Sequence, residues 1–258
     1  MKNTVDILLF GGQSNMQGQT ESVPEYNPPV ENALEYRFLS NSLIPLCHPV
    51  GEDVGEDLIK GAHLQNGSLV PDFCRAYTEK TGHNAIAVHV AKGATTVSQW
   101  QKGTDRYLAA AKKIGGAIEA AKTLGNIGKI YYMWLQGESD GIELTTKEKY
   151  MELLTALKND LKADFSIDKF GIIKVGYFLS LCEGLTPEQQ KTYTEADEAI
   201  MSAQEELVAT DPDFVMLSRV CPYICKLPEY INPEAMGHYN NRAMELIGRD
   251  AANALAKL

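Results

Sequence analysis

Residues 5–16 have the sequence VDILLFGGQSNM, in which a continuous apolar run ends in two glycines, a glutamine and a serine. An apolar run without polar alternation is typical of a strand that is buried on both faces of a parallel sheet. Gly11 and Gly12 allow a sharp turn after this strand, which would place Ser14 at the edge of the sheet. The alternative role for Ser14 is to cap a following helix.

Strand-like and helix-like segments alternate along the rest of the chain. Further strands are expected at residues 85–90, 129–134, 171–179 and 214–217, and helices at 68–80, 104–124, 145–161, from 186 onwards and at 239–258. The helix from Thr186 has a capping box, because Pro187 takes the first helical position and Gln189 lies three residues after the cap. The pattern predicts an α/β fold: a single doubly wound domain over residues 1–258, with about five parallel strands flanked by helices.

Residues 17–67 interrupt this alternation. The segment is rich in Pro, Asn and Glu and has no clear periodicity, so it is predicted to be a long irregular insertion. Loops of this length in a compact domain are usually functional.

Charge and composition exclude several classes of protein. The chain has 24 Lys and Arg against 34 Asp and Glu, a formal charge of −10, so no basic excess is available to neutralise nucleic-acid phosphates. No apolar stretch approaches the roughly 20 residues of a membrane-spanning helix. The five cysteines are scattered and odd in number, which favours a reducing compartment, and Cys221 and Cys225 are expected to be buried thiols rather than metal ligands. The expected location is the cytoplasm, or outside the cell if a leader has been removed.

Polar clusters follow two of the predicted strands. Residues 91–96, AKGATT, include Gly93, and residues 134–140 have the sequence WLQGESD. Ligands of open parallel sheets bind outside the carboxyl ends of the strands, so these clusters are expected to lie near Ser14.

A serine nucleophile needs a base, and the chain has five histidines. His89 lies within a predicted strand, His83 follows a helix end, and His48 and His63 lie in the irregular insertion. His238 follows the last strand and precedes the last helix, so it is expected at the same edge as Ser14.

Together these motifs resemble the sialate O-acetylesterase-like branch of the SGNH hydrolases, which includes the family six carbohydrate esterases. The resemblance is carried by GQSNM at residues 12–16, by Gly93, by WLQGES at 134–139 and by His238 before the C-terminal helix. It implies that a serine esterase removes O-acetyl groups from a carbohydrate, either sialic acid or an acetylated xylan or oligosaccharide, through an acetyl-enzyme intermediate. No metal or organic cofactor is implied.

The resemblance also implies a role for each matching residue. Ser14 would be the nucleophile and His238 the general base and acid. The oxyanion would be bound by the backbone N–H groups of Ser14 and Gly93 and by the side-chain amide of Gln136. Substrate contacts are expected from Gln13, Asn15 and Glu138, whereas Tyr26, Tyr36 and Phe38 of the insertion could stack on sugar rings.

The chain departs from the family at the residue that orients the histidine. An aspartate usually lies three residues before the catalytic histidine, but this position is Ala235. Glu234 is the nearest carboxylate and is predicted to take the role; Glu229, Asp140 or a backbone carbonyl are the alternatives.

Two other functions remain open from the sequence. Because the usual aspartate is missing, one alternative is that the protein binds carbohydrate and has no catalytic activity. The wider SGNH group motivates a lipid esterase or thioesterase, which would need an apolar groove for the acyl chain. The expected partner is a small-molecule or oligosaccharide acetyl ester, without nucleic acid or membrane, and the oligomeric state is left open.

Overall fold

One sheet organises the computed structural model, which describes residues 4–52 and 66–258. Residues 53–65 of the predicted insertion, which include His63, lie outside the described residues. The strands of the sheet are β1 (Thr4–Gly12), β2 (Ala33–Arg37), β3 (Ser42–Pro45), β4 (Asn84–Ala91), β5 (Asn126–Leu135), β6 (Lys169–Ile173) and β7 (Phe214–Ser218).

The strand order is β3-β2-β4-β1-β5-β6-β7, and every pair is parallel except the edge pair β2 and β3. β1 is central, with β4 and β5 on either side. Its last residue, Gly12, pairs with Ala91 of β4 and Leu135 of β5. The loops that carry the three sequence motifs therefore begin side by side at one edge of the sheet.

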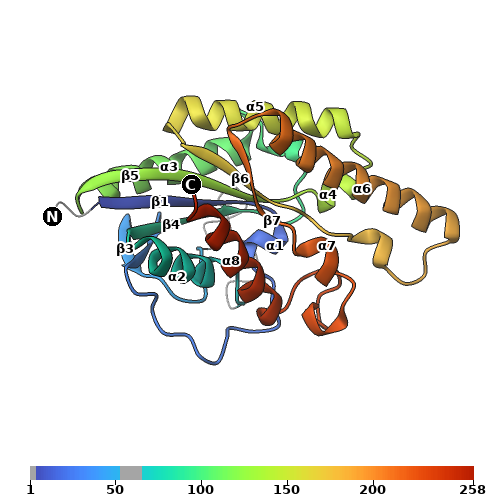
Figure 1. Ribbon diagram of the computed structural model, residues 1–258, viewed down its shortest axis with the longest axis horizontal. Helices are drawn as coiled ribbons and strands as arrows, with labels where there is room; N and C mark the ends of the chain where they lie inside the picture. The colour runs from blue at the N-terminus through green and yellow to red at the C-terminus, as the bar shows by residue number, and fades with distance from the viewer. Residues whose placement is uncertain (1–3, 53–65) are drawn as a thin grey trace.

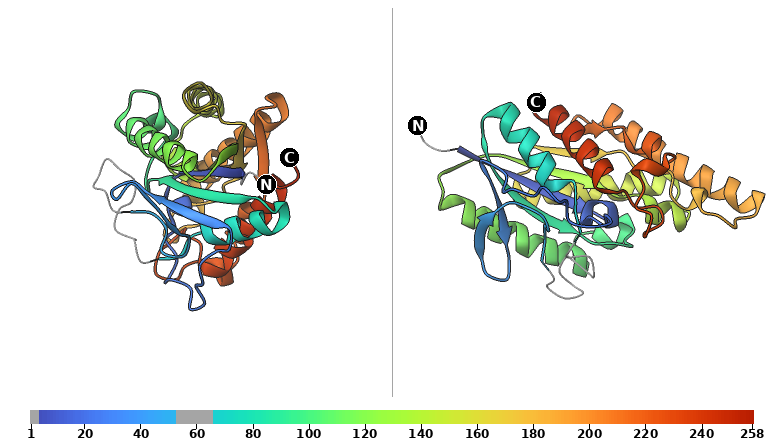
Figure 2. Two further views of the ribbon diagram at one scale, coloured as in Figure 1. Left: turned by 90° about the vertical axis from the view of Figure 1, so that its left-hand side faces the viewer. Right: turned by 90° about the horizontal axis from the view of Figure 1, so that it is seen from below.

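Helices cover both faces of the sheet, as the doubly wound prediction requires. The α-helices are α1 (Ser14–Gln17), α2 (Val70–Thr81), α3 (Asp105–Lys122), α4 (Glu138–Ile142), α5 (Lys147–Phe165), α6 (Pro187–Thr210), α7 (Cys221–Ile224) and α8 (Asn241–Leu255); short 3₁₀ helices are η1 (Val97–Trp100), η2 (Leu179–Leu181) and η3 (Pro228–Tyr230). α3, α5 and α6 lie on one face, and α2 and α8 pack together on the other (Figure 1). The view along the sheet in Figure 2 shows the same three layers.

The predicted elements are confirmed, with two differences. The segment 17–67 is not irregular throughout, because it contains the β2–β3 hairpin, which raises the strand number from about five to seven. The strand expected at 171–179 ends at Ile173. The capping box at Thr186 is present at the start of α6, with Thr186 accepting from the Gln189 N–H and the Gln189 side chain accepting from the Thr186 N–H.

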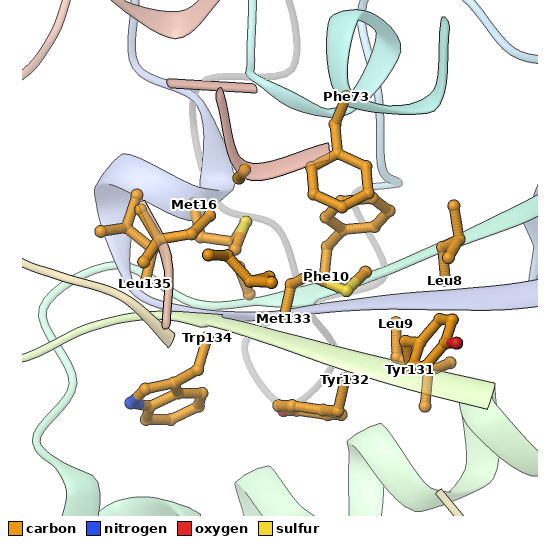
Figure 3. Packing of buried hydrophobic residues seen from close by; sticks show 14 of the residues in the cluster. Leu8, Leu9, Phe10, Met16, Phe73, Tyr131, Tyr132, Met133, Trp134 and Leu135 are labelled. Carbon is orange, nitrogen blue, oxygen red and sulfur yellow. The ribbon is translucent and has the colours of Figure 1, made fainter. Parts of the chain in front are cut away.

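Aromatic side chains fill the core on both sides of the central strands (Figure 3). On the α2 face, Phe10 meets Phe73 edge to face, with ring centroids 5.2 Å apart. On the opposite face Trp134 packs against Trp100 in the same geometry, with centroids 5.7 Å apart. Alternate residues of a strand point to opposite faces, so a strand in the middle of the sheet is mostly apolar on both faces, with Asp6 of β1 and His89 of β4 as buried exceptions. The continuous apolar runs of the sequence have this origin.

Two further expectations concern membrane spans and cysteines. Among the residues that the structure describes, no helix combines the length and the apolar character needed to span a membrane. Cys221 and Cys225 are free thiols, both buried, as predicted.

Candidate active site

The turn after β1 places Ser14 at the carboxyl edge of the sheet. Gly12 has a φ of +135°, and a side chain there would overlap the backbone carbonyl of Leu135. Gln13 donates its backbone N–H to the same carbonyl at 3.0 Å and is the N-cap of α1. Ser14 is the first residue within α1 rather than its cap, and 6% of its surface is exposed. Ser14 is therefore not the helix cap, and Gln13 takes that position.

Three amide side chains flank Ser14 in the sequence, and each contacts a different loop. The first, Gln13, accepts the backbone N–H of Ser139 at 3.1 Å and has a longer contact of 3.5 Å with that of Gly137. Gln13 is 3% exposed. Its side chain therefore fixes the loop between β5 and α4 to the turn after β1, and the predicted substrate contact is replaced by this internal one.

The side chain of Gln17 contacts the loop after β4. Its Oε1 accepts the backbone N–H of Gly93 at 3.0 Å. A Cβ atom placed on Gly93 would lie 3.4 Å from Cβ of Ser14, so Gly93 lies beside Ser14, as the sequence predicts. In this structure, however, the Gly93 N–H is engaged by Gln17, and it can bind an oxyanion only after Gln17 moves away.

The side chain of Asn15 joins two loops. Its Nδ2 donates to Oε1 of Glu138 at 2.8 Å and, more weakly, to the backbone carbonyl of Gly237 at 3.4 Å. Its Oδ1 accepts the backbone N–H of Tyr239 at 3.3 Å. Gly237 and Tyr239 are the two neighbours of His238. The residue after Ser14 thus holds both sides of His238, across 222 to 224 positions of sequence.

His238 lies in a tight loop before α8. The loop is closed by hydrogen bonds from the Asn232 N–H to the His238 carbonyl at 2.8 Å and from the His238 N–H to the Ala235 carbonyl at 3.0 Å. Nδ1 of His238 lies 2.9 Å from the carbonyl oxygen of Met236, and Phe178 packs edge to face on the ring. Because a carbonyl oxygen can only accept, Nδ1 carries the proton, and Nε2 of the neutral ring is the basic nitrogen.

In this structure a backbone carbonyl, one of the alternatives that the sequence left open, lies on Nδ1 of His238. The side chain of Glu234, the predicted partner, is exposed, and its role stays a prediction. Glu229 is also exposed. Asp140 is buried and accepts the N–H groups of Val97 and of the Gln136 side chain.

Gln136 does not supply an oxyanion donor in this structure. The side chain is fully buried, and its Nε2 donates to the Thr95 carbonyl at 2.9 Å and to Oδ2 of Asp140. Both N–H groups are consequently used, and Oε1 faces the hydroxyl of Tyr150 at 3.3 Å. Gln136 links the loop after β4 to α4 in this structure, and its role as the third donor stays a prediction.

Glu138 and Asp140 are buried carboxylates behind the site. Glu138 is 3% exposed and Asp140 1%. Burial raises the pKa of both carboxyl groups, and hydrogen bonds from Asn15 to Glu138 and from Gln136 to Asp140 oppose this rise. Neither side chain faces solvent, so Glu138 and Asn15, which is 1% exposed, are corrected from substrate contacts to internal supports.

Two hollows border the motif loops. One of about 680 Å³ lies between the loops that follow β6 and β7; its lining is mainly apolar and includes Phe178, Leu181, Met236 and Gly237. Another, of about 620 Å³, begins at Ala94 and is lined by polar and apolar surface in about equal parts.

The hydroxyl-rich part of this second lining comprises Thr96, Ser98, Ser139 and Thr145. Of the aromatic residues expected to stack on sugars, Tyr36 is buried with its hydroxyl on Asn41, whereas Tyr26 is 85% exposed. Phe38 is partly buried and packs against the core.

Sequence reasoning missed Gln17 and the Met236 carbonyl. The spacing of amides at 13, 15 and 17 around a serine was a usable signal for Gln17. A backbone carbonyl has no sequence signal. Within the part of the chain that the structure describes, no group of three or more His, Cys, Asp or Glu side chains is placed to hold a metal ion.

Fold and motif geometry together define a doubly wound α/β protein with a serine after its first strand and a histidine before its last helix. The family model for carbohydrate esterases described as sialic acid-specific acetylesterases matches residues 4–216. The chain belongs to this family of carbohydrate acetylesterases.

Individual relatives agree with this assignment. A probable carbohydrate esterase of Arabidopsis thaliana is 30% identical over an alignment of 182 residues, and the match covers 66% of this chain and 67% of the plant protein. A solved structure of an Arabidopsis thaliana protein superposes with a TM-score of 0.73 at 18% identity, covering 100% of this chain and 99% of the other. The structure of NanS has a TM-score of 0.62 at 15% identity and covers 99% and 96% of the two chains. At these identities the structural likeness describes the fold.

Proposed function

We propose that this protein is a serine esterase that hydrolyses O-acetyl groups of a carbohydrate through an acetyl-enzyme intermediate. The observation that carries the proposal is the Asn15 side chain, which holds the peptide groups on both sides of His238 beside Ser14. Through this contact, the loop that carries His238 is held to the residue after Ser14 at the edge of the sheet. A serine and a histidine are the minimum that acyl transfer requires.

In the proposed reaction, Oγ of Ser14 attacks the acetyl carbonyl while Nε2 of His238 takes its proton. The Met236 carbonyl on Nδ1 keeps the ring in the tautomer that this step needs. The imidazolium then gives the proton to the leaving sugar oxygen, and a water activated by His238 releases acetate from Ser14.

Backbone N–H groups stabilise the tetrahedral intermediate. Ser14 contributes the N–H at the start of α1, and Gly93 contributes the second once Gln17 has released it. Each donor of this kind is worth about 3 kcal/mol of transition-state stabilisation. The hydrogen bond from the Gly93 N–H to Gln17 must break before this N–H can bind the oxyanion, and the loss of that bond raises the activation free energy.

For the substrate we propose an O-acetylated sialic acid, because the matching family is described as sialic acid-specific. The hollow next to Ala94, with its hydroxyl side chains, suits a sugar. The test is acetate release from a panel of acetylated sialic acids and xylo-oligosaccharides. Release from the sialic acids that disappears in Ser14→Ala supports the proposal, and release from xylo-oligosaccharides alone refutes the choice of sugar.

One observation favours a second candidate, an esterase of the wider SGNH group that acts on larger apolar esters. The hollow beside the His238 loop is mainly apolar, as a longer acyl chain would require. A series of p-nitrophenyl esters from acetate to octanoate decides between the two functions. The acetylesterase proposal predicts the highest kcat/KM for acetate, whereas a maximum at octanoate would replace it.

A further inference from the structure

The Met236 carbonyl contacts the ring of His238, but it does not connect the His238 loop to Ser14. That carbonyl belongs to the same tight loop as His238, so it orients the ring relative to the loop. Catalysis also needs the loop to be held relative to Ser14. Because Ala235 replaces the usual aspartate, the His238 loop must be held relative to Ser14 by other contacts between the loop and the rest of the site.

Asn15 makes these contacts in a buried position. It accepts from the Tyr239 N–H and donates to the Gly237 carbonyl, so its amide spans the peptide groups on both sides of His238. Asn15 is 1% exposed, so water does not compete for these bonds. Because Asn15 directly follows Ser14, any shift of its side chain changes the distance between the serine and the histidine.

Glu138 determines which way round the Asn15 amide lies. An ionised carboxylate can only accept, so Oε1 of Glu138 selects the NH₂ end of the amide, at 2.8 Å. The oxygen end is then turned to the Tyr239 N–H. With the amide reversed, NH₂ would face the Tyr239 N–H and the amide oxygen would face the Gly237 carbonyl, so both contacts with the His238 loop would become repulsive.

Burial of Glu138 carries a desolvation cost, which the hydrogen bonds from Asn15 and from the backbone of Gly137 and Glu138 offset only in part. Its Oε2 is buried without a hydrogen-bond partner among residues 4–52 and 66–258, and burial raises the pKa of the carboxyl group. An apolar side chain of similar volume would avoid this cost. A buried polar group with an unmet hydrogen bond calls for an explanation by function.

We propose that Glu138 and Asn15 are positioning residues for His238: Glu138 fixes the Asn15 amide, and Asn15 holds the His238 loop at the distance from Ser14 that proton transfer requires. The inference rests on the proposed serine mechanism. It replaces the expectation that these two side chains bind substrate, and the two roles differ in their kinetics. A lost substrate contact raises KM, whereas a misplaced base lowers kcat.

The test compares kcat and KM for p-nitrophenyl acetate in Asn15→Ala, Glu138→Met and Glu138→Gln. A misplacement of about 1 Å at a catalytic pair costs on the order of 100-fold. We expect kcat to fall about 100-fold in Asn15→Ala and Glu138→Met, with KM within about threefold of wild type. Glu138→Gln keeps an acceptor oxygen at nearly the same position, so we expect it to retain kcat within about tenfold.

Asn27→Ala is the matched control. The Asn27 amide binds both backbone groups of one residue, His48, with distances of 2.7 and 2.8 Å, and within residues 4–52 and 66–258 it makes no hydrogen bond to the His238 loop. Its loss should lower stability as much as that of Asn15 and leave kcat within about threefold. An equal fall of kcat in Asn27→Ala would overturn the inference, as would a loss confined to KM in Asn15→Ala.

Amide hydrogen exchange at Tyr239 gives a readout that does not depend on activity. Its N–H donates to Asn15, so exchange should be at least about tenfold faster in Asn15→Ala and Glu138→Met, and unchanged in Asn27→Ala. Unchanged exchange in Glu138→Met would refute the positioning role. Esterase activity that persists in Ser14→Ala would instead refute the proposed function.

Discussion

The substitution Glu234→Gln separates two ways of orienting His238. In one, a carboxylate binds Nδ1 and stabilises the imidazolium that forms during attack. In the other, which the structure contains, the Met236 carbonyl binds Nδ1 and the Glu234 side chain is exposed to solvent. Gln keeps the shape of the side chain and removes its charge, and the backbone N–H bond from Glu234 to Asn232 is retained.

The two arrangements predict effects that differ by orders of magnitude. Removal of an orienting carboxylate from a serine triad lowers kcat about 10⁴-fold. Two unit charges about 8 Å apart in water interact by about 0.5 kcal/mol, and salt reduces this further, so an exposed carboxylate that does not touch the ring has little effect on the imidazolium. We therefore expect kcat of Glu234→Gln to stay within about threefold of wild type.

The assay is the pH dependence of kcat for p-nitrophenyl acetate, with Ser14→Ala as the inactive reference. Loss of one exposed negative charge should move the rise of activity with pH only slightly to lower pH, since the imidazolium becomes a little easier to deprotonate. A fall of kcat by more than about 100-fold across the pH range would refute the reasoning and restore Glu234 as the partner of His238.

Three further predictions concern stability. Lys113→Met should lower the free energy of unfolding by about 3–5 kcal/mol in urea titrations, because it leaves the buried Glu52 carboxylate without its cation at 3.1 Å; a loss below about 1 kcal/mol would contradict this. Hydrogen bonding to Arg219 lowers the pKa of Glu205 to about 2 from 4.5, so the unfolded chain binds the extra proton between these values and stability falls as pH falls. Glu205→Gln should flatten the stability profile in that window, and an unchanged slope would count against the pair. Gly12→Ala should prevent folding or lower the melting temperature by more than about 5 °C, because its Cβ would overlap the β5 backbone, and a melting temperature equal to wild type would show that the turn can relax.

Local sequence determined the elements and their order. The apolar run before Gly11, the capping box at Thr186 and the helical stripes each express a preference that acts over a few residues, and the structure places strands and helices accordingly. The β2–β3 hairpin was not predicted because its pairing does not follow from preferences that act over a few residues. β2 and β3 are short, β3 is a partly exposed edge strand, and β2 pairs with β4, a strand that is distant in sequence.

The sequence also determined which residues gather at the site, because parallel strands bring their carboxyl ends to one edge. Ser14 and Gly93 are neighbours for this reason, and the loop with His238 is held to the residue after Ser14. What each side chain does there was decided only by tertiary structure. Gln136 and Glu138 follow the same strand as polar residues of one motif, yet both are turned inward to partners on other loops.

The partner of His238 shows the physical reason most directly. A hydrogen bond has a range of about 3 Å and depends on direction, so a shift of one residue in a turn decides whether a carboxylate or a backbone carbonyl reaches Nδ1. The sequence favoured Glu234 as the nearest carboxylate and gave no sign that the Met236 carbonyl, two residues further on, would face the ring. The closure of the loop by Asn232 and Ala235 turns the Met236 carbonyl to the ring and leaves Glu234 in solvent, and that geometry exists only in the folded chain.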